Sequence, residues 1–430
     1  MMKKILVLMM LLVFAVFCWG GGQQSKEGTV YLRMYYPVGV AGSLAQLMDG
    51  MIEEFNKTQN EVYVESIFAG GYMEAMDKAQ TAFLAGNPPE LAVLDAPNLL
   101  TLMDIDAVVP LDEYIAKEGG EAYIANFLEG FMKIARYDGK IWSIPWQRST
   151  PIMYFNRDAY TEVGLDPAKA ASTWDELTSY SQKLTSADNA GNVTRWGVLI
   201  PNDYWVVKPL LLQAGGEADN EAGTYIAIDT EEMRVVYRFL NKLAYQLKVT
   251  TGITPWSQSV SDFATGKTAM LYHSTGAMTY IRNSTTYDFG AAYLPKYKRQ
   301  VNIEGGGNFY IFKTDERHQA AAWKVITWLT QPENTAKWSL GSGYIPVRKE
   351  AFDLPDYKAY TDEWPQALVA YHQLIYTDIE RNMMTHRMQE IYDMLNVLDE
   401  KIRGSNDPSV MDQALREAQA EADKILAKWK

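Results

Sequence analysis

The side chains that most often carry catalysis show no catalytic spacing in this sequence. No G-x-S-x-G segment that would expose a nucleophilic serine occurs. The acid pairs Glu53–Glu54 and Glu231–Glu232 fall on predicted helices, where neighbouring acids usually form a solvated face. The histidines show neither an HExxH motif nor another metal-ligand spacing; they are His273, His318, His372 and His386. We therefore predict a protein that is not an enzyme and uses no metal or cofactor. A secreted glycosidase, which needs two carboxylates about 5–10 Å apart, is the alternative from another class.

Binding of a small polar molecule fits the stretch Asp138–Pro167 better. Apolar runs at 141–146 and 151–155 predict two buried strands. Between them lie Gln147, Arg148, Ser149 and Thr150, and a buried polar group without a partner costs about 1–3 kcal/mol. Two interpretations stay open at this point. The cluster is either a tight connection whose hydroxyls cap their own backbone, or a strand that crosses between two lobes with Ser149 and Thr150 facing a ligand.

Further candidates stand where predicted strands end or helices begin. Tyr72 follows a strand at 61–68 and Asp95 follows one at 91–94, and ligands of parallel sheets lie beyond such strand ends. Three glycines, Gly305 to Gly307, precede an aromatic strand; they would let the backbone approach a ligand and offer free N–H groups. No P-loop lysine follows them. Trp205, near a helix start, either stacks on a ligand or belongs to ordinary packing.

The elements that would position these residues alternate between strand and helix. The N-terminal third predicts strands at 30–36, 61–68 and 91–94 with helices at 44–55 and 73–86, hence an α/β fold with a mostly parallel sheet. Thr173 and Glu176 form a capping box at a helix start. Later strands are predicted at 196–200, 269–272 and 289–294, and later helices at 202–212, 230–247, 319–329, 331–341, 388–402 and 408–429.

The amino-acid composition limits the classes of molecule that the protein could bind. A chain of 430 residues is long enough for two or three domains. Its 12 Trp and 27 Tyr suit stacking on sugars, although aromatic residues also build cores. The net charge of −13 repels phosphate backbones, so we expect no nucleic-acid partner.

The N-terminus predicts export. Lys3 and Lys4 precede an apolar run at 5–17, which is too short for the roughly 20 residues that span a bilayer and is typical of a signal peptide. Cys18, the only cysteine, follows, and a polar tract leads to Gly28. This arrangement resembles the lipid-attachment site of bacterial lipoproteins, although Phe17 stands where a small residue is usual. The alternative is an incidental cysteine in a cleaved signal. Either way, we expect a protein without disulfides that works in the periplasm or at the outer face of the cytoplasmic membrane.

Several motifs, in chain order, resemble the extracellular solute-binding proteins of bacterial ABC importers, in the carbohydrate-type family that includes maltose-binding proteins. These motifs are SIPWQRSTPIMYFNRDAYTEVGLDP, TWDEL, GGGNFYI and LTQPENTAKWSLGSGYIPV. The resemblance implies a two-lobed periplasmic-binding-protein fold with hinge crossovers, a ligand cleft between the lobes and delivery of the solute to a permease. We expect a lipid-anchored monomer with a signal peptide at 1–17, a tether at 18–28, one lobe from 29–145 plus 292–345 and the other from 146–291 plus 346–430.

Within that family, Ser-Thr-Pro before an aromatic–Asn pair, the glycine run and Gly-Tyr-Ile-Pro are most similar to the members that bind sn-glycerol 3-phosphate. The resemblance implies glycerol 3-phosphate or a glycerophosphodiester as solute, with a neutral disaccharide or oligosaccharide as the alternative. Two residues depart from the pattern: Asp95 replaces an expected glutamate, and Arg148 adds a charge. Trp146 is expected at the hinge or in the cleft wall. The implied ligand contacts are Tyr72, Asp95, Ser149, Trp205, Ser274, Gly306, Gly307, Tyr344 and an arginine, Arg387 or alternatively Arg381.

Overall fold

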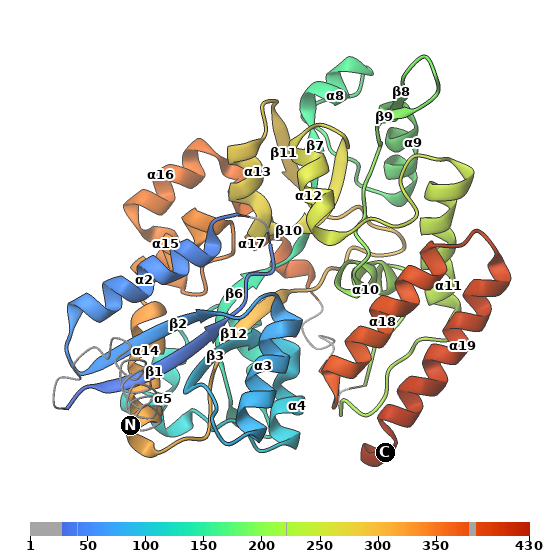
Figure 1. The fold of residues 1–430 in the computed structure, drawn as a ribbon. Helices are drawn as coiled ribbons and strands as arrows, with labels where there is room; N and C mark the ends of the chain where they lie inside the picture. The colour runs from blue at the N-terminus through green and yellow to red at the C-terminus, as the bar shows by residue number, and fades with distance from the viewer. Residues whose placement is uncertain (1–27, 41, 221, 378–383) are drawn as a thin grey trace, which may run out of the picture.

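The computed structural model describes residues 28–40, 42–220, 222–377 and 384–430 (Figure 1). The predicted signal peptide, Cys18 and Arg381 lie outside these residues. None of the helices described is long and apolar enough to cross a membrane.

A five-stranded sheet forms one half of the molecule, in the order β2-β1-β3-β12-β6. Its strands are β1 (Val30–Tyr36), β2 (Val62–Phe68), β3 (Leu91–Asp95), β6 (Ile144–Ser149) and β12 (Gly305–Ile311). The first three pair in parallel as predicted, but β12 runs antiparallel to both β3 and β6. The mostly parallel sheet predicted from the N-terminal strands is therefore confirmed, and β12 is the one strand of this sheet that runs the other way. The reason is topological: β12 enters from a distant part of the chain without a crossover helix.

Two helices connect the parallel strands. Helix α2 (Leu44–Thr58) buries one apolar face, as its spacing predicts, and α3 (Tyr72–Leu84) follows β2. In β2, Val62 and Val64 are buried as predicted, whereas Ile67 is only half-buried. The strand thus leaves the core toward its carboxyl end.

A second, three-stranded antiparallel sheet has the order β10-β7-β11. It consists of β7 (Pro151–Asn156), β10 (Met270–Ser274) and β11 (Phe289–Ala292). The strand predicted at 196–200 does not form. Its backbone N–H groups donate to the carbonyl oxygens of Lys267, Val249 and Met270, so only isolated bridges join it to its neighbours.

The remaining elements cover these sheets. Thr173 caps α9 as predicted, because its hydroxyl accepts from the Glu176 N–H at 3.1 Å. The longer helices are α9 (Trp174–Leu184), α10 (Tyr204–Gln213), α11 (Glu231–Asn241), α12 (Trp256–Ala264), α14 (Glu316–Leu329), α15 (Pro332–Ser342), α18 (Met388–Arg403) and α19 (Pro408–Ile425). The shorter elements are α4 (Leu99–Asp104), α5 (Asp112–Lys117), α6 (Glu121–Ile124), α7 (Glu129–Lys133), α8 (Arg157–Glu162), α13 (Met278–Ser284), α16 (Pro355–Glu363), α17 (Val369–Gln373) and the hairpins β4 (Arg136–Tyr137)–β5 (Lys140–Ile141) and β8 (Ser186–Ala187)–β9 (Val193–Arg195).

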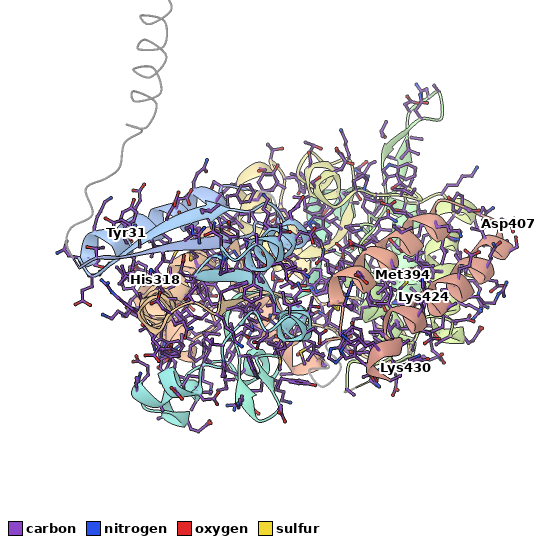
Figure 2. The ribbon with its side chains drawn as sticks, turned by 60° about the horizontal axis from the view of Figure 1, so that its bottom comes forward. Tyr31, His318, Met394, Asp407, Lys424 and Lys430 are labelled. Atoms are coloured by element: carbon purple, nitrogen blue, oxygen red, sulfur yellow. The ribbon has the colours of Figure 1, made fainter. Side chains whose placement is uncertain are left out.

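The two sheets occupy different halves of the molecule. Figure 2 sets Tyr31 and His318 at one end and Met394, Asp407 and Lys424, from α18 and α19, at the other. The C-terminal segment touches both halves. The His386 Nδ1–H donates to the Asp104 carboxylate of α4 at 2.9 Å, and the His386 ring stacks on Trp429 with ring centroids 4.9 Å apart.

The polar cluster of the central stretch lies within a strand rather than in a turn. Strand β6 runs through Gln147 and Arg148 to Ser149, and Thr150 alone separates it from β7. The chain therefore passes from one sheet to the other through a single residue. This arrangement matches the strand-crossing interpretation and continues the five-stranded sheet beyond the predicted lobe boundary at 145.

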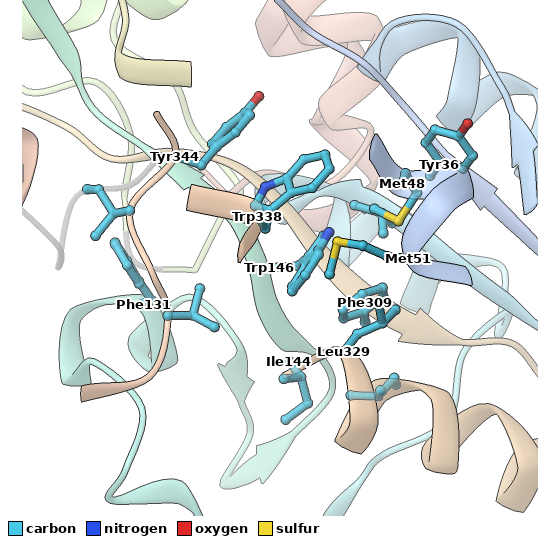
Figure 3. Packing of buried hydrophobic residues seen from close by; sticks show 14 of the residues in the cluster. Tyr36, Met48, Met51, Phe131, Ile144, Trp146, Phe309, Leu329, Trp338 and Tyr344 are labelled. Atoms are coloured by element: carbon cyan, nitrogen blue, oxygen red, sulfur yellow. The ribbon is translucent and has the colours of Figure 1, made fainter. Parts of the chain in front are cut away.

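Trp146 belongs to the core and is not among the residues that line the cavity described below. Only 1% of its surface is exposed, and its ring lies 5.3 Å from Phe309 and 5.4 Å from Trp338, centroid to centroid (Figure 3). The side chains of neighbouring strand residues alternate between faces, so Trp146 points into the packed layer while Gln147 points away from it.

We expect Trp146→Ala to destabilise the fold by about 3–5 kcal/mol, because it removes a large buried ring and leaves a cavity. Urea unfolding followed by circular dichroism measures this loss. The folded variant should keep the solute affinity of the wild type at low temperature. A tenfold weaker affinity for the solute would instead indicate that Trp146 takes part in binding.

Candidate ligand-binding site

A cavity of about 480 Å³ lies between the two sheets, a size typical of small-molecule sites. Residues after β1, β2 and β3 line one side, and residues of α10, α12, β10 and α18 line the other. The strands that cross between the sheets contribute Ser149 and Gly306. The cavity is therefore built by segments that are far apart in the sequence.

Seven of the residues expected to contact a ligand line this cavity, and they come from both sides of it. They are Tyr72, Asp95, Ser149, Trp205, Ser274, Gly306 and Tyr344. Their shared position keeps them as candidates for the proposal below.

Three further candidates lie elsewhere. Trp146 is in the core, as described above, and Gly307 packs against Val93 of the neighbouring strand. Arg387 stands directly before α18, 48% exposed, and its guanidinium pairs with Glu390. It is not among the lining residues, so we do not assign it a ligand.

Tyr72 is held rigidly at the start of α3. Its hydroxyl donates to the side-chain oxygen of Gln147 at 2.8 Å. Glycine is required beside it, because a Cβ on Gly39 would lie 2.7 Å from the Tyr72 ring. The Glu74 carboxylate accepts from the Gly71 N–H and so fixes the first turn of the helix. The ring therefore has one position in the cavity wall.

Asp95 is the carboxylate of the five-stranded sheet that faces the cavity. Its burial raises its pKa from 3.8 to about 7. Arg148 and Lys208 oppose this shift, whereas Asp203, from the other side of the cavity, adds to it. Near neutral pH the site therefore holds a carboxyl group that titrates within the cavity.

Residues at the start of α10 line the side of the cavity opposite Asp95. Asp203 caps the helix by accepting from the Trp205 N–H at 2.8 Å, and it also accepts from the Tyr392 hydroxyl at 2.5 Å. Burial raises the pKa of Asp203 as well. Trp205 and Lys208 are three residues apart and so share one helix face, which lines the cavity.

Aromatic rings form the wall contributed by α12. The Trp256 ring lies 5.9 Å from Trp205 and 3.9 Å from His273, centroid to centroid. Its indole N–H donates to the Gly39 carbonyl oxygen at 2.9 Å and thereby bridges the two sides of the cavity. Burial lowers the pKa of His273 to about 3, so this imidazole is neutral at physiological pH.

Both signs of charge meet in the cavity. Asp95, Asp203 and Glu304 are acidic, and Lys208 is the one cationic side chain among the described lining residues. Glu304 pairs at 2.7 Å with Arg148, which lies directly behind the wall. The groups of three or more His, Cys, Asp or Glu side chains that could hold a metal ion are absent from the described part of the chain.

Most of the residues that line the cavity were not predicted from the sequence. Lys208 could have been found, because it lies one turn after Trp205 on a helix already expected beside the cleft. Glu304 directly precedes the glycine run. No sequence signal marked the remaining missed residues, whose elements come together only in the fold; they include Asp203, Trp256, His273 and Tyr392.

A cavity between two α/β units that are joined by crossing strands is the arrangement of a solute trap, which closes over a small molecule. The chain belongs to the bacterial extracellular solute-binding protein family, whose model matches residues 50–364. It is 25% identical to the sn-glycerol-3-phosphate-binding periplasmic protein UgpB of Salmonella typhimurium over 348 residues, 78% of each chain.

Two solved structures share the fold. UgpB from Mycobacterium tuberculosis in complex with glycerophosphocholine has a TM-score of 0.79 at 22% identity, covering 94% of this chain and all of that one. The maltose/maltodextrin-binding domain MalE from Bdellovibrio bacteriovorus, bound to maltotriose, has a TM-score of 0.80 at 19% identity, covering 93% of this chain and all of that one. The two-lobed α/β fold is confirmed.

The family also defines the general role. This chain is an extracellular solute-binding protein, the component of an ABC importer that binds a small solute outside the cytoplasm and delivers it to a permease. Its homologues are solute-binding proteins rather than enzymes, which confirms the prediction of a non-catalytic protein.

We expect Asp95→Asn to raise the melting temperature of the solute-free protein more at pH 7 than at pH 4. The folded pKa of about 7 exceeds the ordinary 3.8, so the ionised carboxylate costs stability that grows as the pH rises between these values and then levels off. Asparagine removes that cost. Calorimetry across this range measures the difference, with Asp77→Asn on the exposed face of α3 as control. A difference independent of pH would contradict the titration of Asp95.

Proposed function

We propose that this protein captures a glycerophosphodiester with a cationic head group, such as glycerophosphocholine. Its curated relatives at about 25% identity are sn-glycerol-3-phosphate-binding proteins, and a structural neighbour holds glycerophosphocholine. The single observation that carries the choice is the charge of the cavity: one ammonium group among three carboxyl groups.

The charge argues against a phosphate monoester. Such a group carries about −1.5 to −2 charges near pH 7, and Lys208 would have to offset it alone. A phosphodiester carries one negative charge, which one lysine together with hydroxyl and backbone N–H donors can hold. Ser149, Ser274 and Gly306 line the same cavity and supply such donors.

A cationic head group would use the rest of the lining. Ammonium groups bind over the faces of Trp and Tyr rings and close to carboxylates. Trp205, Trp256 and Tyr392 line the cavity together with Asp95 and Asp203. A zwitterionic solute thus meets both signs of charge that the wall presents.

A neutral saccharide is the second candidate, and the pair of indoles favours it. Trp205 and Trp256 offer apolar ring faces, and the buried carboxyl groups can accept from sugar hydroxyls. A structural neighbour holds maltotriose. A neutral saccharide has no anionic group for Lys208 to bind. The effect of removing Lys208 therefore distinguishes the two candidate solutes.

We expect glycerophosphocholine to stabilise the protein against heat, by about 2.7 kcal/mol at 100 times its Kd, and glycerol 3-phosphate to do so less. Lys208→Gln should abolish the effect of glycerophosphocholine, and the exposed Lys183→Gln in α9 should retain it. Titration calorimetry supplies the affinities. A shift with maltotriose alone, insensitive to Lys208→Gln, would replace the first candidate with the second.

We also propose that Cys18 carries a lipid that anchors a monomeric protein to the membrane, and that the lobes divide as given above except that β6 belongs to the first lobe up to Ser149. The apolar run, the single cysteine and the polar tract after it support this proposal. We expect Cys18→Ser to move the exported protein from the membrane fraction to the soluble fraction, as measured by fractionation and immunoblotting. Retention of the variant in the membrane fraction would contradict a lipid on this residue.

A further inference from the structure

Arg148 is a buried cation that the binding function described so far does not use. It lies in β6, three residues before the chain enters the second sheet at Pro151, and 1% of its side chain is exposed. It is not a lining residue, yet two of its partners are.

The contacts of Arg148 join three separate segments. Its guanidinium pairs with Glu304 at 2.7 Å and donates to the Gly306 carbonyl oxygen at 3.0 Å. Its own carbonyl oxygen accepts from the Ile345 N–H at 2.8 Å. The guanidinium carbon also lies 5.2 Å above the centre of the Phe131 ring. Strand β6, the start of β12 and the segment after α15 thus meet at one residue, through its side chain to β12 and through its backbone to Ile345.

Two of these segments carry the chain between the sheets. Strand β6 continues into β7, and the chain returns from β11 to β12 through Glu304. Glu304 and Gly306 line the cavity, and Tyr344, directly before Ile345, lines it too. Arg148 therefore holds the cavity wall and the crossing strands in one register.

The cavity wall around Glu304 is tightly packed. The Glu304 carbonyl oxygen accepts from the Trp205 indole N–H at 3.4 Å, which connects the ion pair to α10 across the cavity. A Cβ on Gly305 would overlap the Trp205 indole. Gly306 has a φ of 96°, and a Cβ there would overlap the Gln147 carbonyl oxygen. A shift of Glu304 must therefore move Trp205 or β6.

The energetics point to a role in geometry. Both side chains of the pair are 1% exposed, so each has lost its hydration, and a buried ion pair contributes little net stability compared with apolar residues of the same size. In some proteins a buried ion pair fixes the register of the segments that it joins.

We infer that Arg148 is a positioning residue, which through Glu304 and Gly306 fixes the cavity wall to the crossing strands so that the two lobes close in one orientation. This inference goes beyond the proposed solute, because it holds for whichever solute binds.

The test measures the distance between the lobes. In a Cys18→Ser background, spin labels at Ser179→Cys in α9 and Ala320→Cys in α14, both exposed, report the distance by pulsed EPR without any solute. Glu304→Gln breaks the pair, and Arg148→Met/Glu304→Met replaces it with apolar groups. The matched control is Asp399→Asn, which breaks the equally buried Arg403–Asp399 pair of α18, 3.5 Å long, away from the crossing strands.

We expect a broader distance distribution in both Arg148–Glu304 variants and an unchanged one in Asp399→Asn. In the same proteins, affinity for glycerophosphocholine, or for maltotriose where that is the solute of the wild type, should fall at least tenfold only when the Arg148–Glu304 pair is lost. The Met/Met variant keeps the test valid if Glu304→Gln does not fold. Wild-type distance widths in that variant would overturn the inference. A wild type that binds neither solute would count against the proposed function alone, because the distance measurement needs no solute.

Discussion

Strands β6 and β7 run through the middle of the molecule with every residue buried and one residue between them. A chain that passes from one sheet to another in this way must satisfy its polar groups inside the protein, since no water reaches them. Tyr72, Gln373 and Glu304 do so, each from a different part of the chain: Tyr72 donates to Gln147, Gln373 donates to Thr150 at 3.0 Å, and Glu304 pairs with Arg148. Each of these partners ties a remote segment to the crossing point, and two of them, Tyr72 and Glu304, also line the cavity. The site exists where it does because the crossing strands need partners there.

The cavity is an unusual electrostatic environment for the same reason. Asp95 and Asp203 stand at the ends of a strand and a helix that face one another, so burial raises the pKa of both. A single lysine and the Arg148 guanidinium behind the wall limit that effect for Asp95. Such a lining selects solutes by charge more strongly than by shape. An unpaired charge buried in this cavity costs more binding free energy than imperfect packing of the solute does.

Much of the fold follows from local pattern. The helical period of α2, the Thr173 cap and the alternation of the first three strands depend on neighbours in sequence, and those predictions are confirmed. The direction of β12 depends on β3, which lies more than a hundred residues earlier in the chain. The failure of 196–200 to pair as a strand depends on partners several tens of residues later. No local pattern reveals either. The site divides in the same manner: Tyr72 and Asp95 could be found at strand ends, whereas Trp256 and Tyr392 reach the cavity only through tertiary packing. Trp146 was expected at the cleft because its neighbours are there, but strand alternation turns it the other way.

The position of the C-terminus affects how the protein can be labelled or fused. Trp429 stacks on His386, and His386 is bonded to Asp104 of the opposite half. The end of the chain is thus part of the seam between the halves rather than a loose tail. A fusion partner, an affinity tag or a dye attached at Lys430 would therefore lie beside the contact between the halves, where it would change or report that contact.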